Sequence, residues 1–128
     1  MRFIPTKFHA PLDYIVGVAL IAMPWIFRFS DVTAATVVSV VLGVGLIAYS
    51  LVTDYELGVW KVAPMAVHNV IDVVAGTVLA ASPWLFDFAD DGAKVWAPFL
   101  VVGIAAVFLG LTTKQHGGYS YRKTATAT

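Results

Sequence analysis

Four long stretches of the chain contain no charged residue, and segments that carry charged residues separate them. The stretches are 14, 22, 14 and 19 residues long, and they cover Tyr14–Phe27, Val32–Thr53, Val73–Phe86 and Val95–Thr113. A helix needs about 20 apolar residues to cross the hydrocarbon core of a bilayer. The second and fourth stretches therefore predict transmembrane helices.

The first and third stretches are too short to cross a bilayer unless they are extended at both ends. Extension to His9–Phe29 and His68–Phe88 gives 21 residues each, or roughly 31 Å of helix. Re-entrant segments are the alternative, but they would have to occur twice in the same way. We therefore expect two more transmembrane helices, with Asp13 and Asp72 about one turn inside the start of each.

Composition agrees with an integral membrane protein. Of the 128 residues, 59% are hydrophobic and 12% are charged, and the mean hydropathy is +0.82; a soluble domain has about 25% charged residues. With no cysteine, the chain has no disulfide or thiol redox centre. The net charge of zero and the few basic residues give no expectation of nucleic-acid binding.

The chain contains an internal duplication. Shifting residues 9–31 by 59 places them on residues 68–90 with 10 of 23 positions identical, and a shift of 60 continues the match more weakly. The matched residues include His9/His68, Asp13/Asp72, Gly17/Gly76, Pro24/Pro83, Trp25/Trp84, Gly43/Gly103 and Thr53/Thr113. We predict an all-α membrane protein of two helical hairpins in one domain, residues 1–128. Repeat 1 covers about 9–58, repeat 2 about 68–118, the connector 54–67, and a flexible tail 119–128.

The distribution of basic residues predicts the topology. Each repeat has two crossings, so the repeats enter the membrane from the same side and are related by a pseudo-twofold axis along the membrane normal. Six basic residues lie on the side that holds both termini, and two lie on the other. The positive-inside rule then places both termini in the cytoplasm, with the protein in the cell membrane.

A proline followed by tryptophan recurs near the end of the first helix of each hairpin, as Pro24-Trp25 and as Ser82-Pro83-Trp84. Proline removes a helix hydrogen bond and frees the carbonyl four residues back, which a nearby hydroxyl such as that of Ser82 could satisfy. The tryptophans and the following phenylalanines suit the membrane interface. We expect a kink that ends each helix and forms an interfacial aromatic belt. A ligand-binding role for the kink is the alternative.

These motifs resemble those of the SPW-repeat family of small prokaryotic membrane proteins. SPWLF at 82–86 is the closer copy, whereas MPWIF at 23–27 departs at the serine. The resemblance covers about residues 9–118 and includes the His-x-x-x-Asp entry to each repeat. It implies a four-helix membrane fold and no established activity.

Four ionisable residues repeat with the same spacing at the predicted cytoplasmic end. His9 and Asp13 are four residues apart, as are His68 and Asp72, and Asn69 lies beside the second pair. Each pair shares one helix face, so the pseudo-twofold axis can bring both pairs into one cluster. Three roles stay open: a structural hydrogen-bond cluster aided by the helix N-terminus, metal or proton handling, and contact with a partner.

Glycines predict where the helices approach closely. Gly43, Gly45, Gly103 and Gly110 lie in the second and fourth spans, although they form no clean GxxxG pair. Small residues allow the backbones of membrane helices to pack against each other. These glycines therefore allow close contact between helices.

The sequence does not disclose a reaction. We expect a structural or accessory role by association in the lipid bilayer, as a homo-oligomer or with a membrane-complex partner. Transport of an ion or small solute through the His/Asp cluster is the alternative, and a membrane enzyme is the last choice. We expect no catalytic residue, no cofactor and no tightly bound metal.

Overall fold

The computed structural model describes residues 2–54 and 57–115. This part of the chain forms α1 (Thr6–Ile26), α2 (Thr33–Val52), α3 (Met65–Leu85), the short 3-10 helix η1 (Ala89–Asp91) and α4 (Ala93–Thr112). The four long helices have 20 or 21 residues, and about 30 Å of helix matches the hydrocarbon core. All four are apolar enough to cross a membrane. The chain is an all-α membrane protein, as predicted.

α1 and α3 begin three residues earlier than predicted, directly after Pro5 and Pro64. The residue before a proline disfavours helical conformation, so neither helix can continue back through Ile4 or Ala63. Both prolines have φ near the fixed proline value, −64° and −61°, with extended ψ. The two Pro-containing segments, and not the histidines, set the helix starts.

The same helices also end three residues earlier than predicted. Beyond Ile26 and Leu85 the chain turns back through Arg28 and Asp87, whose φ values of 58° and 59° are left-handed. The N–H groups of Phe29 and Phe88 then donate to the carbonyls of Pro24 and Pro83, each at 2.8 Å. This left-handed turn is a common way for a helix to satisfy its last carbonyls.

Glycines allow the two helices of each hairpin to pack closely. A Cβ added at Gly43 of α2 would lie 2.7 Å from the carbonyl oxygen of Gly17 in α1. At the equivalent place in repeat 2, a Cβ on Gly103 would lie 2.6 Å from the carbonyl oxygen of Gly76. Gly45 is different, because a Cβ there would meet nothing within 4 Å. Gly45 therefore takes no part in a close helix contact.

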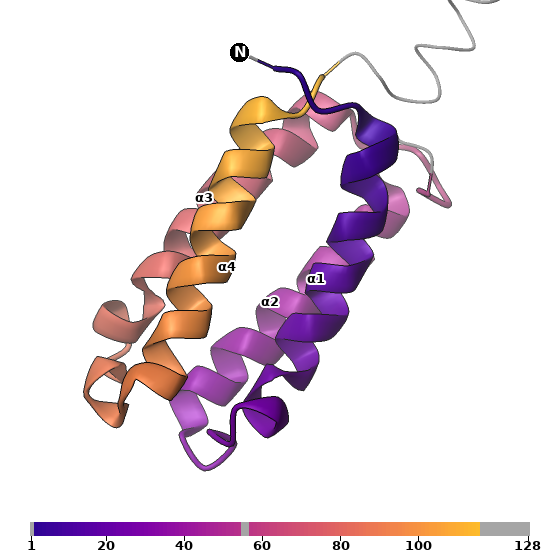
Figure 1. Ribbon diagram of the computed structural model, residues 1–128. Helices are drawn as coiled ribbons and strands as arrows, with labels where there is room; N and C mark the ends of the chain where they lie inside the picture. The colour runs from indigo at the N-terminus through magenta and orange to yellow at the C-terminus, as the bar shows by residue number, and fades with distance from the viewer. Residues whose placement is uncertain (1, 55–56, 116–128) are drawn as a thin grey trace, which may run out of the picture.

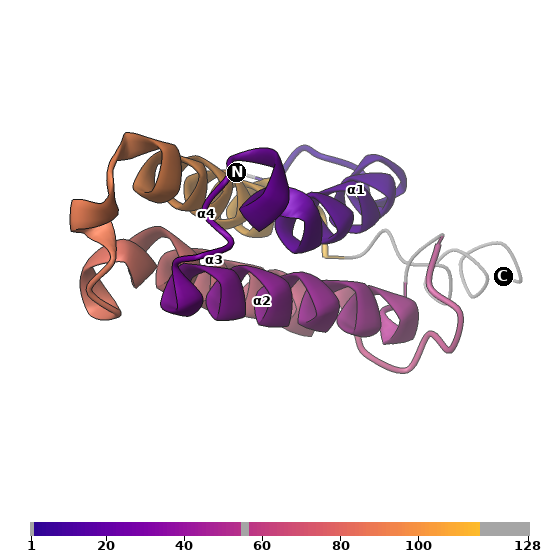
Figure 2. The ribbon, with the colours of Figure 1, turned by 90° about the horizontal axis from the view of Figure 1, so that it is seen from below.

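The four helices form two layers. Figure 2 shows α1 and α4 in one layer and α2 and α3 in the other. The N-terminal segment and the end of α4 lie at one end of the bundle, which we call the terminus end (Figure 1). The loops within the two hairpins lie at the opposite end, the loop end.

Equivalent backbone hydrogen bonds close the terminus end on both sides. Ile4 bridges to Thr113, and Ala63 bridges to Thr53, both in parallel orientation. The donor and acceptor pairs are Phe3 and Ile4 to Thr112, Lys114 to Ile4, Val62 and Ala63 to Val52, and Asp54 to Ala63. The start of the described chain is thus tied to the end of α4 as α2 is tied to α3.

The apolar core lies at the loop end. The ring of Phe99 is 5.8 Å from that of Phe29 and 4.9 Å from that of Phe88, between centroids. The other buried members are Leu20, Met23, Ala35, Leu79 and Val95. The two hairpins therefore meet through aromatic packing at this end and through polar side chains at the other.

Candidate functional site

The structure brings His9, Asp13, His68 and Asp72 together in one buried cluster at the terminus end. Two of these residues come from α1 and two from α3. Nε2 of His9 lies 3.0 Å from an oxygen of Asp13 and 3.0 Å from Oδ2 of Asp72. Nε2 of His68 lies 3.0 Å from the second oxygen of Asp13 and 3.4 Å from Oδ2 of Asp72. Each imidazole therefore contacts one carboxylate of each repeat.

Two threonines hold the opposite nitrogens of these imidazoles. Nδ1 of His9 is hydrogen-bonded to the hydroxyl of Thr113 at 2.6 Å, and Nδ1 of His68 to the hydroxyl of Thr53 at 2.6 Å. The bonds cross between the repeats, because His9 belongs to repeat 1 and Thr113 to repeat 2, and the reverse holds for the other pair. Both threonines are fully buried. Each repeat thus supplies what orients the histidine of the other.

The direction of one of these bonds follows from the hydroxyl of Thr53. This hydroxyl donates its hydrogen to the backbone carbonyl of Tyr49 at 2.8 Å, so toward His68 it can only accept. Nδ1 of His68 therefore carries a hydrogen and donates it. Nε2 of the same ring faces two carboxylate groups, which accept only. A proton on Nε2, or a cation between Nε2 and the carboxylates, makes this contact favourable.

Other side chains next to the cluster form hydrogen bonds or a ring contact there. Asn69, which is buried, donates to the backbone carbonyl of Thr113 at 3.1 Å. Arg2 donates to the same carbonyl and to that of Gly110, both at 2.8 Å. The ring of Tyr49 stacks on that of His68 with 4.7 Å between centroids. Asn69, predicted as part of the cluster, thus anchors the end of α4.

The position of the carboxylates corrects one of the explanations offered from the sequence. With α1 and α3 beginning at Thr6 and Met65, Asp13 and Asp72 are the eighth residue of each helix. They lie two turns inside the helix, whereas the helix dipole acts within the first turn. The helix N-terminus therefore does not explain how two carboxylates are stabilised inside these apolar helices. The contacts with the imidazoles do.

A family model described as SPW repeat domain matches residues 7–113. The chain belongs to the SPW repeat family. No curated protein and no solved structure matches the sequence. The matched range holds repeat 1, most of repeat 2, the four residues of the cluster and the two threonines.

The SPW motif itself lies at the other end of α1 and α3. Pro24 and Pro83 are buried, whereas Trp25 and Trp84 are 60% and 58% exposed. Each helix ends two residues after its proline, and so earlier than the predicted ends at Phe29 and Phe88. The hydroxyl of Ser82 donates to the carbonyl of Val78 at 2.6 Å. The SPW serine therefore does not serve the carbonyl of Leu79 that the proline frees, and that expectation is wrong.

In repeat 1 the carbonyl freed by the proline has a partner that the sequence did not reveal. The hydroxyl of Ser39 in α2 donates to the carbonyl of Leu20. The equivalent of Ser39 under the 60-residue shift is Phe99. The predicted aromatic belt is also wrong in part, because Phe29 and Phe88 are 0% and 1% exposed and pack in the core.

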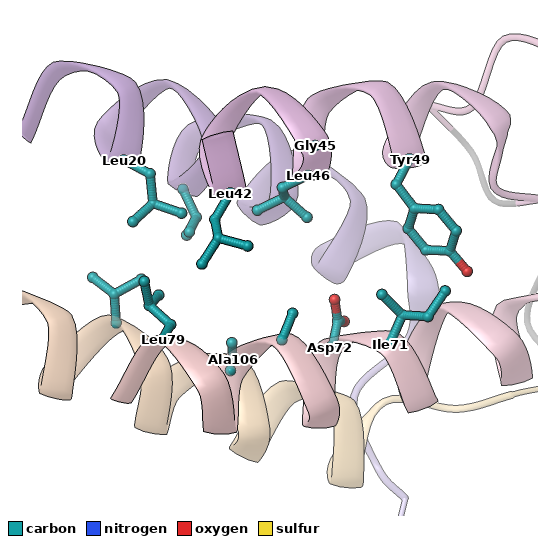
Figure 3. Close-up of a pocket in the computed structure, with 13 residues that line it drawn as sticks. Leu20, Leu42, Gly45, Leu46, Tyr49, Ile71, Asp72, Leu79 and Ala106 are labelled. Carbon is teal, nitrogen blue, oxygen red and sulfur yellow. The ribbon is translucent and has the colours of Figure 1, made fainter. Parts of the chain in front are cut away.

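A cavity of about 310 Å³ lies between the two hairpins. Leu20, Leu42, Leu46 and Leu79 line it, and Asp72 and Tyr49 stand at its terminus end (Figure 3). Figure 3 shows the carboxylate of Asp72 pointing from α3 into this space. The buried Tyr49 hydroxyl has no hydrogen-bond partner among the described residues. The polar cluster thus borders an otherwise apolar chamber.

Proposed function

We propose that this member of the SPW repeat family acts in the membrane by association, as a structural or accessory subunit. The observation that carries the proposal is the nature of the cavity between the hairpins. Among its lining residues, only Tyr49 and Asp72 have polar side chains, and both lie at one end. A path for an ion or polar solute needs polar groups along the depth of the membrane. The apolar lining of the cavity therefore supports association, and not transport, as the proposed function.

The outer surface supports the same proposal. Large apolar side chains such as Ile15, Val41, Val74 and Ile104, one from each long helix, are exposed. They suit lipid tails, and they also suit other membrane helices, which associate through close packing. We therefore propose that the chain binds either copies of itself or a partner in a membrane complex. The proposal includes no catalytic role and no nucleic-acid contact.

The proposed setting is the cell membrane with both termini in the cytoplasm. The six-to-two excess of basic residues on the terminal side supports this orientation, in line with the positive-inside rule. The cluster of His9, Asp13, His68 and Asp72 would then lie toward the cytoplasmic face. Two of its four contacts, His9 with Asp72 and His68 with Asp13, join α1 to α3 and so fix the two hairpins relative to each other.

Native mass spectrometry of the protein, extracted with its surrounding lipid, tests association. We expect one discrete assembly with a fixed stoichiometry, either of copies of this chain or of this chain with one partner. The competing function is transport, which the contact of Asp72 with the cavity favours. Monomeric protein that carries protons or divalent ions into liposomes, and loses this flux with Asp72→Asn, would overturn the proposal in favour of transport.

A further inference from the structure

The cluster at the terminus end has the composition of a metal site. His9, Asp13, His68 and Asp72 each offer one ligand atom, and these four atoms all lie within 4.8 Å of one another. Two are imidazole nitrogens and two are carboxylate oxygens. All four residues are buried, which sets them apart from exposed acidic groups that face water.

The four ligand atoms of the cluster lie close enough together for one ion to draw them into four-coordination. Zinc binds nitrogen and oxygen ligands at about 2.0–2.1 Å, and a tetrahedron of such bonds has edges of roughly 3.3 Å. The four nitrogen-to-oxygen contacts are 3.0, 3.0, 3.0 and 3.4 Å, and they use both oxygens of Asp13. With one ligand atom from each residue, the four atoms lie within 4.8 Å of one another. The nitrogen-to-oxygen contacts are thus close to the edge of such a tetrahedron, and the widest separation would shorten by up to roughly 1.5 Å when an ion binds.

The threonines give the histidines the orientation of metal ligands. A metal-bound histidine nearly always hydrogen-bonds through its second ring nitrogen, which fixes the ring and its tautomer. Nδ1 of His68 donates to Thr53, and Nδ1 of His9 is hydrogen-bonded to Thr113. Both Nε2 atoms are thereby directed at the carboxylates. This support is the same in the two repeats.

Charge and ligand type narrow the class of ion. Two buried carboxylates carry two negative charges, which one divalent cation balances while both imidazoles stay neutral. Magnesium and calcium prefer six or more oxygen ligands, whereas two imidazoles with two carboxylates suit zinc and related transition metals.

We propose that His9, Asp13, His68 and Asp72 bind one divalent transition-metal ion of the zinc class, shared equally between the two repeats. The ion would take the place between the imidazoles and the carboxylates that protons otherwise fill, and would link α1 to α3. This proposal replaces the expectation from the sequence that no metal is tightly bound. It goes beyond the proposed association and does not depend on it, because the chain could assemble with or without the ion.

Cobalt substitution tests the site directly. Tag-free protein, purified in detergent and stripped with a chelator, is titrated with Co²⁺ and followed by visible absorption. We expect the intense bands of four-coordinate cobalt to saturate at one equivalent per chain and to disappear when Zn²⁺ is added. Wild-type protein that gives only the weak spectrum of six-coordinate cobalt, or no binding, would overturn the proposal.

Variants locate the ion. Asp13→Asn and Asp72→Asn should each weaken Co²⁺ binding more than 100-fold while the helical circular dichroism is kept. Thr53→Val, which removes only the orienting bond, should weaken binding about 10- to 100-fold. Two controls are His116→Gln, outside the described residues, and Asp90→Asn at the loop end, and neither should change binding. Equal cobalt affinity in folded Asp13→Asn protein would contradict the site, and the wild-type titration decides if that variant does not fold.

Discussion

Removing either threonine hydroxyl should destabilise the protein, although valine has nearly the same shape. Thr113→Val removes the 2.6 Å hydrogen bond to Nδ1 of His9, and Thr53→Val the 2.6 Å bond to Nδ1 of His68. Each variant leaves a fully buried ring nitrogen without its partner. An unpaired buried polar group costs about 1–3 kcal/mol. We expect each variant to lower the free energy of unfolding by that amount.

The neighbouring Thr112 is the matched control. Its hydroxyl donates to the carbonyl of Phe108 in its own helix at 2.6 Å and takes no part in the cluster. Thr112→Val should change the free energy of unfolding by less than about 0.5 kcal/mol, as substitutions away from buried networks do. Unfolding in mixed detergent and dodecyl sulfate micelles, followed by helical circular dichroism, measures all three variants. Equal effects of Thr112→Val and Thr113→Val would refute the reasoning.

A double-mutant cycle tests the exchange of partners between the repeats. His9→Gln combined with Thr113→Val should show a coupling energy of about 0.5–3 kcal/mol, the range for residues in direct contact. His9→Gln combined with Thr53→Val should show less, because Thr53 contacts His68 and not His9. A larger coupling for the second pair would mean that each histidine uses the threonine of its own repeat.

Three further predictions address packing, the kink and the topology. Gly43→Ala should destabilise the bundle, because its Cβ would lie 2.7 Å from the carbonyl oxygen of Gly17. Gly45→Ala, whose Cβ would meet nothing within 4 Å, should be neutral or stabilising in the same unfolding assay. A larger destabilisation by Gly45→Ala than by Gly43→Ala would contradict this packing. Ser39→Ala should lower the free energy of unfolding by about 1 kcal/mol more than Ser82→Ala does, because of these two serines only Ser39 serves a carbonyl freed by proline. Equal effects of the two variants would count against that role. Reporter fusions at Thr128 and in the loop near residue 91 should report opposite sides of the membrane, and the same side for both would exclude four crossings.

The sequence was sufficient to predict the four crossings and the residues of the cluster. Charge-free stretches of near-membrane length and an internal match of 10 in 23 positions carried those predictions. Helix bounds were harder, because hydropathy does not show where an extended proline segment stops a helix. The signal was present in Pro5 and Pro64, which are equivalent under the 59-residue shift and directly precede α1 and α3.

The partners of the cluster could not be derived from local pattern. Thr53 and Thr113 match each other under the 60-residue shift, yet this match says only that both copies keep a hydroxyl there. That each threonine serves the histidine of the other repeat depends on how the hairpins pack, which involves residues 104 positions apart in one case. The burial of Phe29 and Phe88 was missed for a similar reason, because an aromatic residue after a helix suits a membrane interface and a core equally well.

The two ends of the bundle differ in how far the repeats agree, and this difference indicates where the chain is most constrained. At the loop end the copies differ: Ser39 serves a proline-freed carbonyl in repeat 1, whereas the equivalent Phe99 packs in the core between Phe29 and Phe88. At the terminus end the imidazole, carboxylate and hydroxyl groups are the same in both copies, and each histidine depends on the opposite repeat. A group that must match a partner in the other copy cannot change alone without loss. The crossed contacts therefore explain why the same side chains occur in both repeats. One shared ion would add a second reason, because all four side chains would have to remain metal ligands.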